Sequence, residues 1–183
     1  MTKKYGIIGN PIKHSLSPTL HNYWFEKYKI DANYSIIEID NNELPNLIDR
    51  IKNKDLIGIN ITLPYKQKIV PHIDVLINDA EITSSVNTVF LDDKGTIVGE
   101  NTDVFGLQAA YLKEVDNISR RNALVIGAGG VSPSVILSLE KCGVKNISIT
   151  NRTEDKCIFL KKKFKYLNIC LLYTSPSPRD KTV

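Results

Sequence analysis

A lysine that follows a proline turn is the first residue whose type and setting could do chemistry. Lys66 ends the segment N-I-T-L-P-Y-K, which runs over residues 60–66. Asn60 and Thr62 lie two apart at the end of a predicted strand, so both should point to one face. They could bond ring hydroxyls of a ligand, and Lys66 could exchange a proton with a carbonyl group. The alternative for an isolated lysine is an ordinary surface residue.

Two hydroxyl side chains, Ser15 and Ser17, follow the first predicted strand, Tyr5–Gly9. Loops after the carboxyl ends of parallel strands are where α/β proteins bind ligands. Hydroxyls two residues apart can converge on one carboxylate. The alternative is structural: Ser17 would cap the next helix, with Pro18 at its first position, and Ser15 would fill the loop.

Two further polar side chains stand near strand ends. Asn87 lies in V-N-T (86–88), and Asp103 ends G-E-N-T-D (99–103) just before a predicted helix. Asn87 could instead be a turn residue, and Asp103 is a natural cap for that helix. These segments carry polar residues where a fold usually places apolar or turn residues, which favours a ligand site.

The elements that must position these residues alternate between strand and helix patterns. Strands are predicted over 5–9, 34–39, 56–62, 86–91 and 97–99, and helices over 17–28, 43–52 and 104–114. The first helix carries apolar residues at helical spacing: Leu20, Trp24, Phe25 and Tyr28. A turn signal at 92–95 separates the last two strands. The order predicts an α/β fold with a mostly parallel sheet and helices on both faces, with a first domain over 1–103.

A second α/β unit is predicted over 104–169. Its strand at 123–126 runs into a glycine turn and then a helix, which is the context that supports dinucleotide binding. Pro133 sits in the first turn of that helix, where its missing N–H costs little. The pyrophosphate would lie at the helix N-terminus, against Gly127, Ala128, Gly129, Gly130 and Val131. The alternative is a glycine-rich turn without a ligand.

The end of the next strand distinguishes between cofactors. An NAD site places an acidic side chain there, whereas this chain has Asn151, Arg152 and Thr153. A guanidinium matches a 2′-phosphate bidentately, so the segment favours NADP as the cofactor. An exposed arginine at a strand end is the alternative.

The last residues are set aside from fold and function. Residues 170–180 read CLLYTSPSPRD, where a Rossmann unit should deliver its third strand. The string resembles a translated transposase sequencing adapter, so we treat 170–183 as an adapter-like, non-native tail. Beyond Tyr166 we predict no further element.

Composition narrows the class without naming a function. The net charge of +4 comes without a long basic block, so no nucleic-acid partner is predicted. No apolar run approaches the roughly 20 residues that span a bilayer. Cys142, Cys157 and Cys170 show no metal-ligand spacing, so no metal is expected. With no signal-peptide pattern at the start, a cytoplasmic protein is expected.

In this order and at these separations, the segments resemble the shikimate dehydrogenase family. Its pattern runs S-x-S-P, N-x-T-x-P-[FY]-K, V-N-T, N-T-D and a glycine-rich G-A-G-G. The resemblance covers about Tyr5 to Thr153. Each motif alone is weak, but five in register are specific.

The resemblance implies roles for these residues. Lys66 and Asp103 become the catalytic pair, with Lys66 transferring the proton. Shikimate would be bound through its carboxylate by Ser15 and Ser17. Its ring hydroxyls would be bound by Asn60, Thr62, Asn87 and Asp103. Two departures stand out: Ser84 and Ser85 replace a frequent glycine and alanine, and an arginine frequent near Pro133 is absent.

The resemblance also implies an activity: NADPH-dependent reduction of 3-dehydroshikimate to shikimate, on the route to chorismate and aromatic amino acids. A quinate/shikimate dehydrogenase that uses NAD or another substrate is a close alternative. A non-catalytic binding relative is disfavoured because it would not need Lys66 and Asp103. Since later strands of the cofactor domain should lie beyond 169, this polypeptide by itself is expected to be inactive, as a truncated member. A monomer or homodimer with a small-molecule substrate is expected.

Overall fold

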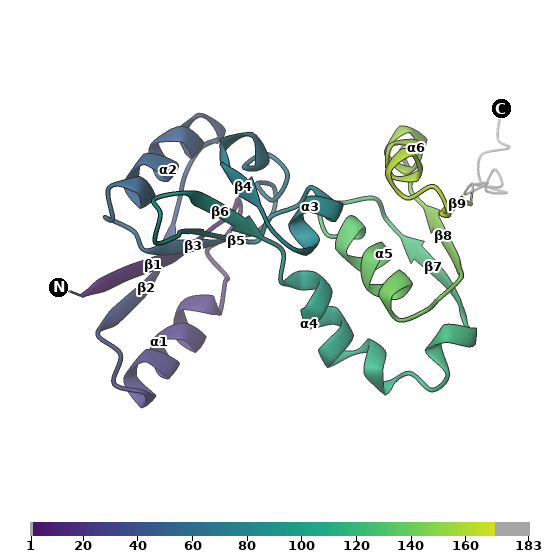
Figure 1. Ribbon diagram of the computed structural model, residues 1–183, viewed down its shortest axis with the longest axis horizontal. Coiled ribbons are helices and arrows are strands. Elements are labelled where there is room, and N and C mark those ends of the chain that lie inside the picture. Colours follow the sequence, from purple (N-terminus) through teal and green to yellow (C-terminus); the bar gives the residue numbers. More distant parts are fainter. Residues whose placement is uncertain (1, 171–183) are drawn as a thin grey trace, which may run out of the picture. The chain divides into compact units, whose positions relative to one another are not determined.

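Two separate β-sheets organise the chain, one in each of the units Met1–Val104 and Phe105–Val183. The computed structural model describes residues 2–170 (Figure 1). The first sheet has the strand order β2-β1-β3-β5-β6-β4, and the second has the order β7-β8-β9.

The first sheet is mixed but rich in parallel pairs. Its strands are β1 (Lys3–Ile8), β2 (Ala32–Ile37), β3 (Gly58–Ile61), β4 (Val75–Leu76), β5 (Thr88–Leu91) and β6 (Ile97–Glu100). Three of the five pairings are parallel, and only β5 runs antiparallel to its neighbours, β3 and β6. The predicted α/β fold with a mostly parallel sheet is confirmed, with β5 as the reversed strand.

The predicted turn at 92–95 joins β5 to β6 and reverses the chain direction between them. Gly95 has a φ of +82°, which a glycine adopts without strain. The Asp92 carboxylate accepts the N–H groups of Lys94 and Thr96 at 2.9 and 2.8 Å. These bonds, that of Thr96 above all, lower the pKa of the Asp92 carboxyl. The turn therefore closes a β5–β6 hairpin, which brings the start of β5 beside the end of β6.

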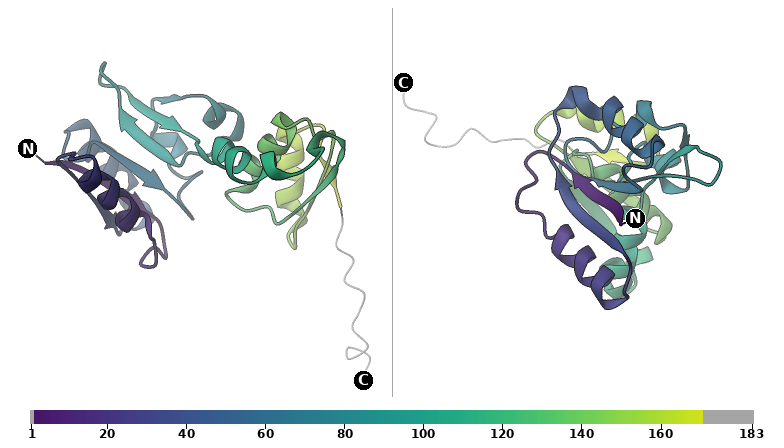
Figure 2. Two further views of the ribbon diagram at one scale, coloured as in Figure 1. Left: turned by 90° about the horizontal axis from the view of Figure 1, so that it is seen from below. Right: turned by 90° about the vertical axis from the view of Figure 1, so that its left-hand side faces the viewer.

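Two helices cover opposite faces of the first sheet. Helix α1 (Ser17–Lys27) lies on one side and α2 (Leu44–Lys52) on the other (Figures 1 and 2). The side chains of adjacent strand residues point to opposite faces, so β1 contributes side chains to the packing on both faces of the sheet. Ile8 packs in the core that α2 covers, whereas Ile7 packs in the smaller cluster that includes Phe25 of α1.

Ser17 does not cap α1, contrary to one sequence interpretation. It is the first helical residue, and Leu16 occupies the capping position without a side-chain bond. Instead the Ser15 hydroxyl accepts the N–H of Ser17 at 3.3 Å. The main-chain N–H at the start of α1 is therefore bonded by the hydroxyl of Ser15, two residues earlier, a local bond that serine side chains commonly make.

The apolar residues of α1 are not buried as its periodicity suggests. Within the described residues no α1 side chain is buried, and Leu20, Trp24 and Tyr28 are exposed. Trp24 and Tyr28 stack on each other with ring centroids 5.6 Å apart. Phe25 alone of the predicted stripe packs inward, against Tyr5 at 5.6 Å.

One short strand escaped prediction, β4, whose two residues are too few for a hydrophobic period to appear. The short helical stretch expected between Pro64 and Val86 is present as α3 (Asp79–Thr83), with five residues. The predicted linking helix is present as α4 (Asp103–Ala110), followed by a short 3₁₀ turn at Leu112–Glu114.

The second unit has the predicted Rossmann-type order. Its elements are β7 (Asn122–Ile126), α5 (Ser132–Lys141), β8 (Asn146–Thr150), α6 (Glu154–Lys163) and β9 (Asn168–Ile169), and its strands are all parallel. Pro133 lies in the first turn of α5, as expected. The prediction of no element beyond Tyr166 is wrong, because β9 pairs with β8 there. Apart from Cys170, the proposed tail lies outside the described residues.

A single amide ties α1 to the edge strand β2 and gives a first prediction. Asn22 donates to the Tyr34 carbonyl at 2.8 Å and accepts the Tyr34 N–H at 2.9 Å. Asn22→Ala should lower the free energy of unfolding by about 1–2 kcal/mol, since both main-chain groups lose their partner. Urea denaturation measures this. Asn33→Ala, an exposed neighbour on β2, is the control, and an equal loss in both variants would contradict the prediction.

Candidate active site

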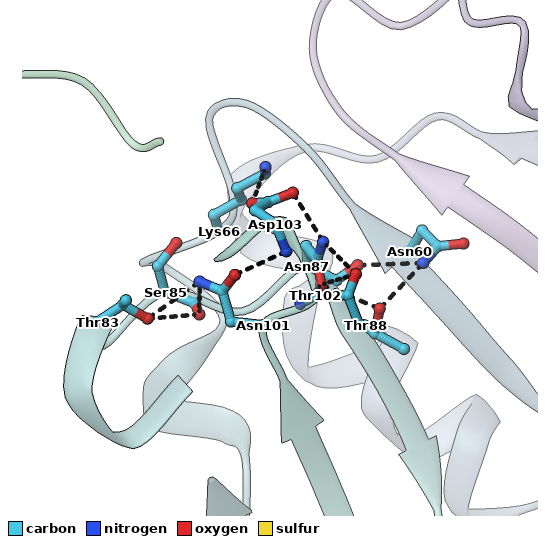
Figure 3. A network of polar contacts seen from close by, with 9 residues as sticks. All are labelled: Asn60, Lys66, Thr83, Ser85, Asn87, Thr88, Asn101, Thr102 and Asp103. Carbon is cyan, nitrogen blue, oxygen red and sulfur yellow. Dashed lines mark hydrogen bonds and ion pairs between the residues drawn. The ribbon is translucent and has the colours of Figure 1, made fainter. Parts of the chain in front are cut away.

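Lys66 and Asp103 form a direct ion pair in the first unit (Figure 3). The Lys66 Nζ donates to the Asp103 Oδ2 at 2.7 Å. The two side chains are only 11% and 24% exposed, so solvent screens this pair less than an ordinary surface pair. An ammonium held this way can donate a proton to an oxygen, and the carboxylate orients it.

The segment that carries Lys66 is anchored at both ends. After β3 the chain turns, and the Tyr65 N–H donates to the Thr62 carbonyl at 2.9 Å. The Tyr65 ring is 1% exposed, and its hydroxyl donates to the Ile39 carbonyl at 2.8 Å. The Lys66 carbonyl in turn accepts the Val86 N–H at 2.8 Å. Only the Lys66 side chain is left to extend toward Asp103.

Asn87 holds the second oxygen of the carboxylate. Its Nδ2 donates to the Asp103 Oδ1 at 2.9 Å, and its Oδ1 accepts the Thr102 N–H at 3.0 Å. Because a main-chain N–H can only donate, this bond determines which end of the Asn87 amide faces Asp103. Both carboxylate oxygens of Asp103 thus have a donor, Lys66 on one and Asn87 on the other.

Asn101 supports Asp103 from below and was not predicted as a site residue. It is 3% exposed, and its amide donates to the Thr83 hydroxyl at 3.0 Å and to the Ser85 carbonyl at 2.9 Å. Its Oδ1 accepts the Asp103 N–H at 3.0 Å. The N-T-D motif contains Asn101, but a single sequence gives no sign that this amide turns inward.

The backbone shows why the family pattern has a frequent glycine at position 84. Ser84 has a φ of 48° and a ψ of 42°, the left-handed region that glycine adopts without strain. The neighbouring Ser85 is fully buried, and its carbonyl accepts the Asn101 amide. A small residue is therefore required at 85, and serine meets that requirement.

Asn60 is linked to this group but does not contact Lys66 or Asp103 directly. Its Oδ1 accepts the Tyr34 hydroxyl at 2.7 Å, and its Nδ2 donates to the Asn87 carbonyl at 3.3 Å and the Thr88 hydroxyl at 3.2 Å. Each polar atom of its side chain is directed at a protein partner. Tyr34 and Thr88 were not predicted as site residues.

Thr62, Ser15 and Ser17 belong to a neighbouring pair of loops. The Asn10 N–H donates to the Leu63 carbonyl at 2.9 Å. A side chain at Gly9 would lie 2.5 Å from the Thr62 Cγ2, so only glycine allows this approach. The structure thus packs the loop that leads to the two serines against Thr62, while Lys66, Asn87 and Asp103 form the hydrogen-bonded cluster.

The second unit carries an open glycine turn. Gly127 has a φ of +107°, its N–H donates to the Thr150 carbonyl at 2.8 Å, and its own carbonyl accepts the Ser132 hydroxyl at 2.9 Å. A side chain at Gly129 would meet no heavy atom within 4 Å. The turn therefore leaves free space beside the N-terminus of α5, where a phosphate fits.

The segment after β8 shapes this turn. The Asn151 Oδ1 accepts the Ala128 N–H at 3.2 Å, and its Nδ2 donates to the Thr153 carbonyl at 2.8 Å. Arg152 and Thr153 are exposed, and the remaining predicted residues, Gly130 and Val131, lie between the turn and α5. Asn151 thus brings residues 151–153 beside the glycine turn.

Among residues 2–170, no group of three or more His, Cys, Asp or Glu side chains could hold a metal ion. No helix within the same range is long and apolar enough to cross a membrane.

A lysine–carboxylate pair in one α/β unit and an open glycine turn in a parallel α/β unit define a two-domain protein with dinucleotide-binding architecture. Residues 7–89 match the family model for the shikimate dehydrogenase substrate binding domain, and residues 109–175 match that for shikimate / quinate 5-dehydrogenase. The chain belongs to the shikimate dehydrogenase family. The second match includes the first residues of the segment set aside as a tail.

Relatives and solved structures agree with both matches. The chain is 46% identical over 169 residues to the shikimate dehydrogenase (NADP(+)) of Pelagibacter ubique, covering 92% of this chain and 63% of that protein. It matches the crystal structure of shikimate dehydrogenase from Aquifex aeolicus at 37% identity with a TM-score of 0.85, covering 92% of this chain and 62% of that one.

A third match is a Thermus thermophilus shikimate 5-dehydrogenase in complex with NADP(H) and shikimate. It is 29% identical with a TM-score of 0.80, and the match covers 92% of this chain and 62% of that one. The chain thus spans about three fifths of the length of these proteins, in agreement with the expectation of a chain shorter than those family members.

The buried Asn101 amide gives a second prediction. Asn101→Ala should lower the free energy of unfolding by roughly 3 kcal/mol, because Thr83 and Ser85 would keep buried polar groups without this partner. Denaturant unfolding of the variant tests this. Asn53→Ala, an exposed position after α2, should change stability by less than about 0.5 kcal/mol. Similar losses in the two variants would show that Asn101 does not support the site.

Proposed function

We propose that the natural protein carrying this chain is an NADP-dependent shikimate dehydrogenase, which reduces 3-dehydroshikimate to shikimate reversibly. The observation that carries the proposal is the Lys66–Asp103 pair, with 2.7 Å between Nζ and Oδ2. The family membership and the relatives' names support it, but the chain spans only 63% of the Pelagibacter protein. The proposal therefore concerns the natural polypeptide rather than these residues alone.

The first unit offers polar groups for a cyclic hydroxy acid. We assign the substrate carboxylate to Ser15 and Ser17, whose loop packs against Thr62. The ring hydroxyls fall to Thr62, Asn87 and Asp103. The Thermus protein in complex with shikimate supports this substrate class. The contacts of Asn60 with Tyr34, Thr88 and the Asn87 carbonyl argue for a supporting role.

The proton chemistry follows from the pair. When bound, NADPH supplies the hydride that reduces the ketone carbon. We assign to the Lys66 ammonium the proton that the carbonyl oxygen takes up when it becomes the hydroxyl of shikimate. Asp103 accepts a hydrogen bond from Lys66 and so holds Nζ in one direction. In the oxidative direction neutral Lys66 takes the proton back.

The second unit suits the cofactor. The free space at Gly129 lets the backbone approach a pyrophosphate at the N-terminus of α5. We assign the 2′-phosphate to Asn151, Arg152 and Thr153, because no acidic side chain stands at the end of β8. Arg152 is exposed and free to fork onto a phosphate.

The substrate and cofactor roles fall to successive parts of the chain. We propose a substrate domain over 1–103 and a cofactor domain over 104–169, which the division at Val104 supports. We further propose a cytoplasmic protein, since Cys142, Cys157 and Cys170 are free thiols. We expect a monomer or a homodimer, and sedimentation velocity distinguishes the two.

Replacing the proton donor tests the function directly. In the natural polypeptide, Lys66→Ala should lower kcat for shikimate oxidation with NADP by about 100-fold or more, because proton transfer loses its group. The KM for shikimate should change far less. The assay is growth of the reduced-nicotinamide absorbance, with exposed Lys94→Ala as the control.

Two outcomes of that assay would overturn the proposal. Unchanged turnover in Lys66→Ala removes the residue from the reaction. A wild-type protein that oxidises quinate but not shikimate belongs to the quinate branch of the family, the alternative that the second family model includes.

The cofactor assignment has its own test. Arg152→Asp should weaken binding of NADP at least tenfold and bring the dissociation constants of NADP and NAD closer together, because the guanidinium that would pair with the 2′-phosphate is lost. Calorimetric titration with each dinucleotide measures both constants. Lys162→Asp makes the same charge change on an exposed face of α6 and should leave the ratio unaltered. An unaltered ratio in Arg152→Asp refutes the assignment.

A further inference from the structure

We propose that Tyr34, Asn60 and Thr88 are positioning residues for the catalytic pair. They act through Asn87, along a chain of side-chain hydrogen bonds that ends on the carboxylate of Asp103 (Figure 3 shows the part from Asn60 onward). This inference rests on the proposed function, because it assigns new residues to the same site.

The strand register brings the members of the chain together. Asn60 on β3 lies directly opposite Thr88 on β5, and Thr88 lies opposite Glu100 on β6. Asn87 comes just before β5, and the N-T-D segment (101–103) comes just after β6. The sheet itself therefore places a polar side chain of β3 beside the residues that hold Asp103.

The directions of these hydrogen bonds determine the orientation of the Asn60 side-chain amide. The Asn87 carbonyl can only accept, so it must face the Asn60 Nδ2, and the Asn60 Oδ1 must then face the Tyr34 hydroxyl. Tyr34 is thus the donor of that bond, at 2.7 Å. Burial raises the pKa of the Tyr34 hydroxyl, so it keeps its proton.

The chain continues with the same polarity to the active site. The Thr88 hydroxyl accepts from Asn60 at 3.2 Å and donates its single hydrogen to the Asn87 Oδ1 at 3.0 Å. The Asn87 Nδ2 then donates to the Asp103 Oδ1 at 2.9 Å. Each donor points toward Asp103, and bonds in such a series polarise and strengthen one another.

Tyr34, at the end of the hydrogen-bond series farthest from Asp103, is held rigidly. Tyr34 is 4% exposed, and Asn22 binds both its main-chain N–H and its carbonyl. His21 stacks on the Tyr34 ring with centroids 4.2 Å apart and an angle of 8°. A fixed tyrosine with no described contact to Lys66 or Asp103 is therefore connected to them only through Asn60.

These bonds give Asn60 a supporting role. Both hydrogens of its Nδ2 have protein partners, and its Oδ1 accepts the Tyr34 hydroxyl. An amide oxygen can accept two hydrogen bonds, so a ring hydroxyl that leaves this network intact could reach only the second lone pair of Oδ1. On this geometry the residue predicted as a ligand also holds Thr88 and the Asn87 main chain in place.

The kinetic test uses an isosteric pair of variants at Thr88 in the natural polypeptide. Thr88→Val keeps the shape but removes the hydroxyl, and it should lower kcat for shikimate oxidation about threefold to tenfold. The KM for shikimate should stay within about twofold, since no substrate contact is lost. Thr88→Ser restores the hydroxyl and should restore most of kcat. A change in KM alone, or no rescue by serine, would overturn the inference.

The remote end is tested with a matched pair of tyrosines. Tyr34→Phe removes only the hydroxyl and should lower kcat about twofold to fivefold. Tyr5→Phe is the control, because Tyr5 lies opposite Tyr34 in the β1–β2 register and loses the same atom. Its kcat should not change. Because both substitutions interrupt one chain, Tyr34→Phe combined with Thr88→Val should be no slower than Thr88→Val alone, and fully multiplied losses would contradict the chain.

A readout independent of turnover separates this inference from the proposed function. In ¹⁵N-labelled protein, the side-chain amide of Asn87 should exchange its hydrogens several-fold faster in Tyr34→Phe than in wild type or Tyr5→Phe. If the wild type does not oxidise shikimate, the proposed function fails, and this measurement still decides whether the chain exists. Equal exchange in the two tyrosine variants would disprove it.

Discussion

The arrangement of the site depends on one requirement, that the partly buried carboxylate of Asp103 have a donor on each oxygen. Lys66 supplies one and Asn87 the other. A charged carboxylate removed from water is costly unless it is paired and hydrogen-bonded. The donors come from segments distant in sequence, so the sheet must bring three strand ends to one place.

The reversed strand β5 meets this requirement. Because β5 runs antiparallel to both neighbours, its first residue lies beside the last residues of β3 and β6. In an all-parallel sheet the start of β5 would lie at the opposite edge from those ends. The antiparallel β5–β6 hairpin thus places Asn87 beside Asp103, on the carboxylate oxygen that Lys66 does not bind, although the rest of the sheet follows the parallel α/β pattern.

In the second unit, the proposed phosphate site is formed mainly by the backbone of the glycine turn. Gly127 adopts a φ of +107°, and a side chain at Gly129 would meet no heavy atom within 4 Å, so no side chain covers the backbone of this turn at the proposed phosphate position. Asn151 ties this turn to the end of the neighbouring strand. We assign the choice of dinucleotide to the exposed side chain of Arg152, so this choice would be separate from the shape of the turn.

The sequence by itself determined the α/β class, most long elements, the glycine turn, and the identity of Lys66, Asn87 and Asp103 as polar residues in a family pattern. These follow from local periodicity and residue type, which a single chain displays directly. It misjudged the capping of α1, the exposure of that helix's apolar residues, and the short strand β9, because these depend on what packs nearby.

Only the tertiary structure decided which polar residues meet and in which direction their hydrogen bonds run. Asn60 and Asn87 look alike in sequence, yet the side chain of Asn60 binds Tyr34 and Thr88 while that of Asn87 binds Asp103. The difference arises from strand register, and register is a relation between segments that no local pattern records.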